Sequence, residues 1–168
     1  SSSGQINDPD GVVIEGTLYE YVGNYNNATS VEPGQGYWLR ASSDGGITVS
    51  SNSARFSSDD LSGLSDGMNS LEITNVSGFK STLYFGVEVP EENKLSFSLP
   101  PVPPEGAFDI RFEGNWRASE TGGEILVQNW NWPLNLQFLI GNVQSDFEEW
   151  VLFDEMNELE FVLDESGS

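Results

Sequence analysis

The stretch Leu99-Pro-Pro-Val-Pro-Pro-Glu-Gly-Ala-Phe-Asp-Ile-Arg-Phe112 decides how the rest of the chain is organised. It holds four of the eight prolines, so residues 100–104 can neither form a helix nor donate regularly to a sheet. Polyproline II, which is stiff and extended, is the conformation expected there. Directly afterwards Phe108, Ile110 and Phe112 alternate with charged residues, which predicts a half-buried strand.

A second alternating pattern precedes the prolines. Leu95, Phe97 and Leu99 are separated by serines, which predicts a strand over residues 95–99. The prolines then form a rigid crossover between two strands. Proline-rich ligands of aromatic-groove domains have a similar composition, but the flanking strands favour the structural interpretation.

Short strands and tight turns fill most of the remaining chain. Residues 12–14 and 18–22 are rich in β-branched and aromatic residues, and residues 37–49 predict a hairpin that turns at Asp44-Gly45-Gly46. Further strands are predicted at residues 71–74, 81–89, 150–153 and 159–163. No convincing helix is found.

The longest regular pattern covers residues 130–140, where Trp130, Trp132 and four other apolar residues occupy every even position. Period-two alternation of this length cannot be a helix and predicts a strand of roughly 12 residues. Pro133 falls on the polar face, which indicates an edge strand or a bulge. Because the parity is unbroken, both tryptophans are expected in the core.

These elements predict an all-β protein, with a small β unit followed by a jelly-roll-like or Ig-like β-sandwich. The predicted organisation is a flexible entry or donor segment at 1–11, the small β unit at 12–56, a connector at 57–70 and the sandwich at 71–168. At 168 residues, one domain or a small pair can bury a real core.

The charge balance excludes several classes of partner. With 6 basic and 27 acidic residues, the formal charge is −21. A chain without a basic footprint has no general grip on nucleic acid and is not attracted to anionic membranes. No apolar run is long enough to span a bilayer, so membrane insertion is not expected. Solubility by repulsion is the simplest role for the acid excess, and divalent cation binding is the alternative.

The usual catalytic residues are missing. There is no cysteine and no histidine, which removes disulfides, thiolate nucleophiles and the commonest general base. Two carboxyl groups could serve a glycosidase, but no pair stands out among 27 acids. We therefore expect no enzymatic activity and no cofactor other than calcium.

The calcium hypothesis rests on the turn Asp8-Pro9-Asp10-Gly11. Asn7, Asp8 and Asp10 resemble half of a calcium loop and are the candidate ligands, although their spacing fits no complete loop motif. Asn27-Ala-Thr29 and Asn75-Val-Ser77 match the acceptor pattern for N-glycosylation, so Asn27 and Asn75 are candidate glycan sites.

Carbohydrate binding is the alternative interpretation of the aromatic residues. Trp130 and Trp132 point the same way along the predicted strand and could form a stacking platform for neighbouring sugars. Trp116, isolated in a polar loop at residues 114–123, is the better candidate for an exposed contact. The core interpretation of Trp130 and Trp132 is favoured because the alternation continues to Ile140.

Two motifs together resemble a known kind of module. Residues 31–42, Val-Glu-Pro-Gly-Gln-Gly-Tyr-Trp-Leu-Arg-Ala-Ser, look like the PGxGYW unit of secreted bacterial surface proteins. Residues 83–86, Leu-Tyr-Phe-Gly, and the proline stretch look like the β-module that often follows it near the sorting ends of large exported proteins in Bacteroidota-like bacteria. The resemblance spans about residues 10–165 and implies an extracellular, non-catalytic module. It supplies no catalytic or ligand residues.

The resemblance also bears on the two ends. In similar proteins a Trp-containing strand precedes the first unit and another strand follows the equivalent of residues 163–168. Both are missing here, so we expect a chain cut from a longer one or completed by a neighbour. Completion by a neighbour predicts strand sharing, in which Val12, Val13 and Ile14 add to the open edge of another copy.

Two functions follow as hypotheses. The favoured one is a structural protein that builds an extracellular or cell-surface layer or filament through contacts between copies of itself. The alternative is a carbohydrate-binding or adhesive module of a larger secreted protein, with glycans as partners.

Overall fold

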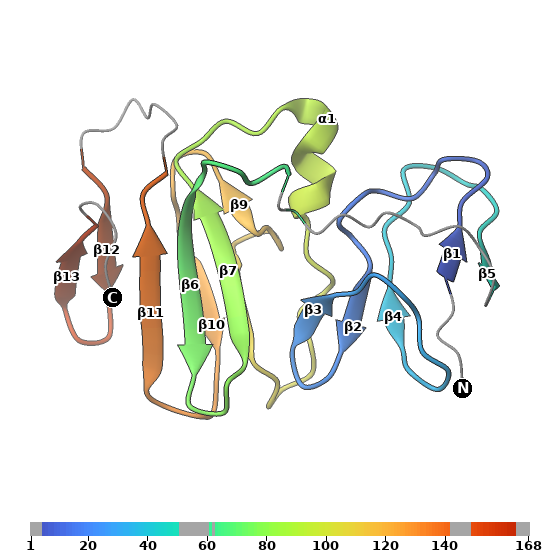
Figure 1. Cartoon of the computed structure of the whole chain (residues 1–168). Coiled ribbons are helices and arrows are strands. Elements are labelled where there is room, and N and C mark those ends of the chain that lie inside the picture. The colour runs from blue at the N-terminus through green and yellow to red at the C-terminus, as the bar shows by residue number, and fades with distance from the viewer. Residues whose placement is uncertain (1–4, 51–60, 62, 142–148, 164–168) are drawn as a thin grey trace.

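The computed structural model describes residues 5–50, 61, 63–141 and 149–163. Within them strands dominate and one short α-helix occurs, which confirms the all-β prediction (Figure 1). The jelly-roll-like or Ig-like topology stays a prediction. The elements are β1 Gln5–Asn7, β2 Tyr19–Tyr21, β3 Tyr25–Asn27, β4 Tyr37–Trp38, β5 Thr48–Ser50, β6 Asn69–Asn75, β7 Lys80–Phe85, α1 Glu91–Lys94, the 3-10 turn η1 Leu95–Phe97, β8 Asp109–Phe112, β9 Ala118–Ser119, β10 Ile125–Gln128, β11 Leu134–Leu139, β12 Val151–Asp154 and β13 Leu159–Val162.

The N-terminal unit, residues 5–50, consists of two small antiparallel sheets (Figure 1). β2 lies between β3 and β4, and β1 pairs with β5. The core of this unit is small, with Ile6, Leu18 and Ala28 buried. β1 lies inside the segment predicted as a flexible entry, so that segment contains a paired strand.

The hairpin predicted over residues 37–49 is wrong, because β4 pairs with β2 and β5 pairs with β1. The turn at residues 44–46 packs against an earlier turn instead. The Gly46 N–H donates to Asp10 Oδ2 at 2.8 Å, and a Cβ on Gly45 would meet Val12. Contacts between two distant turns therefore decide the strand pairing here, and a local hairpin signal does not encode them.

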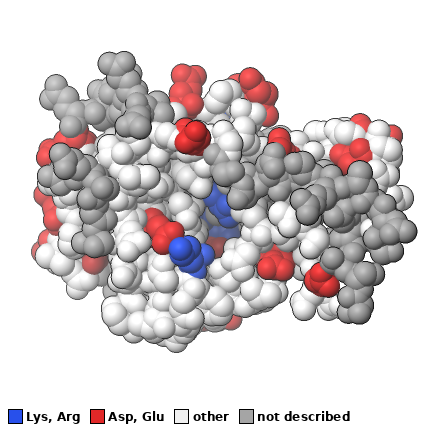
Figure 2. Space-filling view, viewed as in Figure 1, with Lys and Arg blue, Asp and Glu red and all other residues white. Residues whose placement is uncertain are grey.

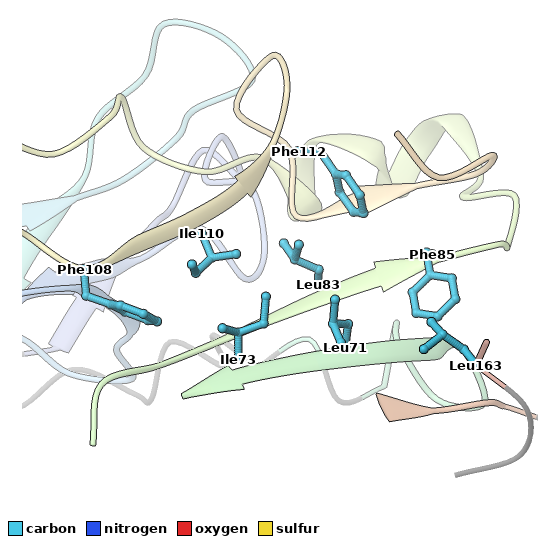
Figure 3. Close-up of a cluster of buried hydrophobic side chains, with 8 residues drawn as sticks. All are labelled: Leu71, Ile73, Leu83, Phe85, Phe108, Ile110, Phe112 and Leu163. Atoms are coloured by element: carbon cyan, nitrogen blue, oxygen red, sulfur yellow. The ribbon is translucent and has the colours of Figure 1, made fainter. Parts of the chain in front are cut away.

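The C-terminal unit, residues 61–163, contains a four-stranded sheet in the order β11-β6-β7-β9 and a separate β8–β10 pair. Figure 3 shows Leu71, Ile73 and Leu83 of the sheet facing Ile110 and Phe112 of β8. A strand with one buried face alternates in this way. The buried residues of this main core are Leu71, Ile73, Leu83, Phe85, Phe108, Ile110, Phe112 and Leu163.

A third pair of strands lies at the edge of the C-terminal unit. β12 and β13 pair with each other in antiparallel fashion, and the hairpin that they form lies beyond β11 (Figure 1). Leu163, directly after β13, is buried in the main core, and Trp150 and Leu152 pack against it. The hairpin is thus anchored at its base while its strands stay largely exposed.

The strand predicted over residues 95–99 is wrong, because the chain forms α1 and η1 there. Pro90 precedes the helix, and Glu91 and Glu92 occupy its first turn, where acidic side chains are favourable. The Lys94 N–H donates to Pro90 O at 3.1 Å. These start signals outweigh a short alternating pattern.

The strand predicted over residues 130–140 is too long, because β11 begins at Leu134. Pro133 has no N–H to donate to a neighbouring strand, which explains why the strand starts after it. Both tryptophans therefore precede the strand, and the prediction that they are in the core is wrong. Trp130 is 64% exposed and Trp132 is 60% exposed.

The strand predicted after the prolines is confirmed as β8, but both of its faces are buried. Ile110 and Phe112 contribute to the main core. On the other face Arg111 is 1% exposed, and Asp109 is buried beside it. A strand predicted as half-buried is thus covered on its charged face as well.

Part of the connector predicted at 57–70 is also packed. Residues 57–60 and 62 lie outside the described residues, but Leu61 is buried with Val89 and Phe97. Residues 69–70 already belong to β6. The predicted domain boundaries stay a prediction.

Candidate functional site

The two units meet at a junction of aromatic rings and an arginine. Tyr19 on β2 is 1% exposed, and its hydroxyl donates to Ser98 O at 3.2 Å. Arg117 reaches back from the C-terminal unit, and its Nη1 donates to Asn27 Oδ1 on β3 at 2.7 Å. The guanidinium carbon of Arg117 lies 5.3 Å from the centroid of the Tyr19 ring, within the range of a cation–π interaction. One arginine therefore holds two strands of the N-terminal unit.

Backbone contacts extend this junction. The Phe108 N–H donates to Gly23 O at 3.0 Å, and Asn24 Nδ2 donates to Lys80 O at 3.3 Å. Gly23 has a φ of 102°, and a Cβ on it would lie 2.8 Å from Cζ of Phe79. The turn between β2 and β3 needs a glycine for its backbone conformation and for the close approach of Phe79.

Arg111 fastens the proline stretch to β8. Its Nε and Nη2 donate to the two carboxylate oxygens of Asp109 at 2.5 and 2.6 Å. Its Nη1 donates to Pro100 O and to Asn115 Oδ1, each at 2.7 Å. A bidentate pair of this kind is strongly directional. The start of the crossover, the strand that follows it and the turn after that strand are thereby fixed to one another.

Two open hollows adjoin these elements. One, of about 330 Å³, lies between the units, and its lining includes Trp38, Arg40 and Pro100. The other, of about 400 Å³, lies against α1 and β9, and its lining includes Lys94 and Glu120. Lys94 Nζ lies 2.6 Å from Glu91 Oε1 and 3.6 Å from Glu120 Oε1, so this ammonium group pairs with both carboxylates.

Three titratable groups among the described residues have pKa values that depart from the usual ones. Burial raises the pKa of the Tyr25 hydroxyl. A hydrogen bond to Glu91 raises the pKa of Lys94, and a hydrogen bond from Asn157 lowers the pKa of Asp154. These groups belong to β3, α1 and β12. The perturbed groups are therefore spread over the chain and do not form one acid–base pair.

The candidate calcium ligands are engaged in ordering the turn between β1 and β2. Both carboxylate oxygens of Asp8 accept backbone N–H groups from residues 12–13, at 3.1 and 2.8 Å. Asp10 accepts the Gly46 N–H, and the exposed Asn7 points its amide toward Thr48 at 3.5 Å. The described part of the chain contains no group of three or more Asp, Glu, His or Cys side chains that could share a metal ion.

The two candidate glycosylation sites are built into the fold. Asn27 Nδ2 donates to Gly16 O at 2.6 Å, and Asn27 Oδ1 accepts a hydrogen bond from Arg117 Nη1. Asn75 is 5% exposed, and its Nδ2 donates to Asn129 Oδ1 at 3.1 Å. In the folded chain both amide nitrogens thus donate to oxygen atoms of the protein, and glycosylation at Asn27 and Asn75 stays a prediction.

The three tryptophans considered for sugar stacking differ from the expectation. Trp116 is half-buried and packs against the main core, so the prediction that it is the better exposed candidate is wrong. A Cβ on Gly114 would lie 3.1 Å from its ring. Trp130 and Trp132 are instead the two exposed indoles, in the connection between β10 and β11.

The predicted assembly segment already has partners in its own chain. Val13 forms an antiparallel bridge with Ala41, and the Ile14 N–H donates to Arg40 O at 2.9 Å. The Ser42 N–H donates to the carbonyl of Val12, whose side chain is buried. Strand sharing through Val12, Val13 and Ile14 would require all of these contacts to break.

No family model matches the chain, and no match was found among the curated proteins or the solved structures. Within the described residues, no helix has the length and apolar character needed to cross a membrane.

The sequence analysis did not predict the contacts of the junction or the pairing of Asp109 with Arg111. For Asp109 and Arg111 a signal was present, because residues two apart on a strand share a face and opposite charges at that spacing can pair. Tyr19 and Arg117 carry no such signal. They are far apart in the sequence, and only the docking of the two units brings them together.

Proposed function

We propose that the chain is a non-catalytic structural module of an extracellular surface protein, in which the two β units act as one rigid body. The observation that supports this proposal is the junction at Tyr19, Asn27 and Arg117. Units joined by a linker usually move relative to each other. A polar network that is wholly or partly buried restricts such motion, because its hydrogen bonds exist in only one relative orientation.

Composition and resemblance support the other parts of the proposal. A chain without histidine and cysteine lacks the commonest catalytic side chains. The resemblance to secreted surface modules supports the extracellular location. Acidic side chains are spread over the face seen in Figure 2, which favours solubility through repulsion.

Backbone ¹⁵N relaxation tests the rigid-body proposal. We expect both units of the wild type to tumble with one rotational correlation time. Arg117→Met removes the bond to Asn27 and the contact with Tyr19, so the two units should then show separate correlation times. Lys80→Met, which removes only the exposed ion pair with Glu72, is the matched control. Two correlation times in the wild type would show that the proposal is wrong.

Contacts between copies remain part of the proposal, through the β12–β13 hairpin rather than the N-terminal segment. Val151, Phe153 and Val162 share one face of this hairpin and are each about half exposed. Contiguous exposed apolar side chains commonly mark contact sites. The hairpin also carries four acidic residues, at 154, 155, 158 and 160, which repel the same surface of a second copy.

Sedimentation velocity over a range of salt concentrations tests this self-association. Added salt shortens the screening length from about 8 Å at physiological ionic strength to about 3 Å at 1 M, so association should increase with salt. Phe153→Ser should abolish it, whereas Val49→Ser, which changes an exposed valine of the N-terminal unit, should not. A monomer at every salt concentration would show that the self-association proposal is wrong. This outcome would not bear on the rigid-body proposal, which the relaxation experiment tests.

A further inference from the structure

The connection between β10 and β11, residues 129–133, presents two large indoles to solvent. Trp130 is 64% exposed and Trp132 is 60% exposed. Most of the other aromatic side chains pack against a core or a neighbouring ring. Leaving two indoles, only two residues apart in the sequence, in water gives up the free energy that their burial would supply. Neighbouring exposed apolar side chains of this size indicate a contact surface.

Side-chain hydrogen bonds of two asparagines, Asn75 and Asn129, hold the backbone that carries the indoles. Asn75 Nδ2 donates to Asn129 Oδ1 at 3.1 Å, and the Asn131 N–H donates to the same oxygen at 3.3 Å. Asn129 Nδ2 closes the loop by donating to Asn131 O at 2.9 Å. Asn75 is itself fixed, since its Oδ1 accepts the N–H groups of Ser77 and Phe79. A surface ordered before binding loses less conformational entropy when a ligand arrives.

The sequence around the indoles carries no charge. Residues 125–141 contain no Asp, Glu, Lys or Arg, although the whole chain has 33 such residues, 6 basic and 27 acidic. This segment offers no carboxylate to a cationic ligand, and the net negative charge of the molecule repels an anionic ligand or membrane. A neutral ligand meets no electrostatic penalty at this neutral segment.

Hydrogen-bonding groups continue from the indoles along β11. Asn135 and Gln137 lie on the outward face of this strand and are exposed. In register with them on β6 are Thr74 and Glu72, and Glu72 is paired with Lys80. β11 begins two residues after Trp132, so this row of amide, hydroxyl and paired charged groups follows the indoles directly along the chain. Its amides and hydroxyl can donate to and accept from the hydroxyls of a sugar chain.

We propose that Trp130 and Trp132, together with the outward amides of Asn135 and Gln137, bind a neutral polysaccharide. The indole faces pack against the C–H faces of two sugar rings, and the amides bond to the hydroxyls of rings further along β11. This combination of apolar platforms with a few oriented polar groups is the usual make-up of a ligand site. The site is independent of the junction, so its test does not depend on the rigid-body proposal.

Affinity electrophoresis in native gels tests the proposal. The probes are soluble neutral polysaccharides, namely a β-glucan, a xylan, a mannan and a galactan, with alginate as an anionic comparison. We expect at least one neutral polysaccharide to retard the wild type and alginate to leave it unretarded. Retardation by none of the four neutral polysaccharides would overturn the proposal.

Variants then locate the site. The double variant W130A/W132A should raise the dissociation constant for the retarding polysaccharide by about tenfold or more. Its thermal unfolding midpoint should stay unchanged, because both side chains are largely exposed. Trp38→Ala, which alters an exposed tryptophan of the N-terminal unit, is the control and should keep full binding. Full binding by W130A/W132A would overturn the assignment.

A further pair of variants separates sugar binding from contact with a second copy. Asn135→Ala and Gln137→Ala should each reduce affinity for the polysaccharide by several fold, without changing the sedimentation coefficient. If W130A/W132A instead dissociates an oligomer and no variant alters retardation, the indoles contact another copy and the polysaccharide proposal is wrong.

Discussion

At the junction between the two units, Tyr19 is buried and both its hydroxyl and its ring have partners, whereas Trp130 in the β10–β11 connection is largely exposed. Both residues belong to segments rich in aromatic and polar side chains. The difference lies in what covers them, because a second unit packs on Tyr19 and leaves it 1% exposed, whereas Trp130 stays 64% exposed. Aromatic content alone therefore does not separate packing from recognition.

The two regions also differ in how they use polar groups. At the junction, hydrogen bonds join residues that are distant in sequence, such as Arg117 and Asn27. In the β10–β11 connection, Asn129 and Asn131 order the turn locally, and one bond from Asn75 anchors it. We therefore expect substitutions at the junction to change stability and substitutions at the indoles to change binding.

The largest expected effect comes from Arg111. Arg111→Met leaves the buried Asp109 carboxylate without its partner and frees Pro100 O, so the free energy of unfolding should fall by about 3–5 kcal/mol. Denaturant unfolding measures this loss. Adding Asp109→Asn to the variant should restore part of the stability, because no uncompensated charge then remains. No recovery in the double variant would contradict the ion-pair explanation.

A smaller loss is expected when the close approach at Gly23 is blocked. Gly23 has a φ of 102°, and Gly23→Ala places a Cβ 2.8 Å from the Phe79 ring. The free energy of unfolding should therefore fall by about 1–3 kcal/mol. Gly36→Ala is the control, since nothing lies within 4 Å of its Cβ position. Thermal unfolding of both variants gives the comparison, and equal effects would show that the turn is not tightly packed.

Removing one hydroxyl should have a still smaller effect. Tyr19→Phe loses the bond to Ser98 O but keeps the ring under Arg117, so we expect a loss of about 1 kcal/mol in unfolding free energy. Trp130→Phe keeps an exposed aromatic ring and should change stability by less than about 0.5 kcal/mol. A larger loss for Trp130→Phe than for Tyr19→Phe would reverse the comparison between the two regions.

The smallest effect concerns alkaline pH. Burial raises the pKa of Tyr25 above its value in the unfolded chain, which is about 10. The contribution of Tyr25 to the free energy of unfolding is therefore fully present below that pH. It is lost as the pH rises through the pKa of Tyr25 in the folded state. Ultraviolet titration should show a late ionisation that the substitution Tyr25→Phe removes. A titration curve unchanged by this substitution would place the late ionisation elsewhere.

The sequence predicted strands best where alternation coincided with a buried face. The pattern around Ile73 and Leu83 gave β6 and β7, and that around Ile110 gave β8. It failed before the prolines, where start signals at Pro90 and Glu91 favour a helix over a short alternating run. β10 was not predicted at all, because Ile-Leu-Val-Gln is too short to show a period.

The candidate sites were harder to predict because each depends on distant partners. The acceptor pattern at Asn75 is local, but the hydrogen bond of its side chain depends on Asn129 in the distant β10–β11 connection. Asp8 and Asp10 were grouped correctly in one turn, but their carboxylates face backbone N–H groups that a spacing rule does not register. The spacing of Trp130 and Trp132 suits a stacking platform, but their exposure depends on where β11 begins.

By itself the sequence determined the all-β class, the stiffness of the proline crossover and the acidic character of the surface. Each follows from residue type and local periodicity, because dihedral restriction, alternation and charge act between near neighbours. Only the tertiary structure decided that Arg111 is buried and that Trp130 is exposed. Alternation tells which side chains share a face, but whether that face is covered depends on the segments that pack against it, and these come from elsewhere in the chain.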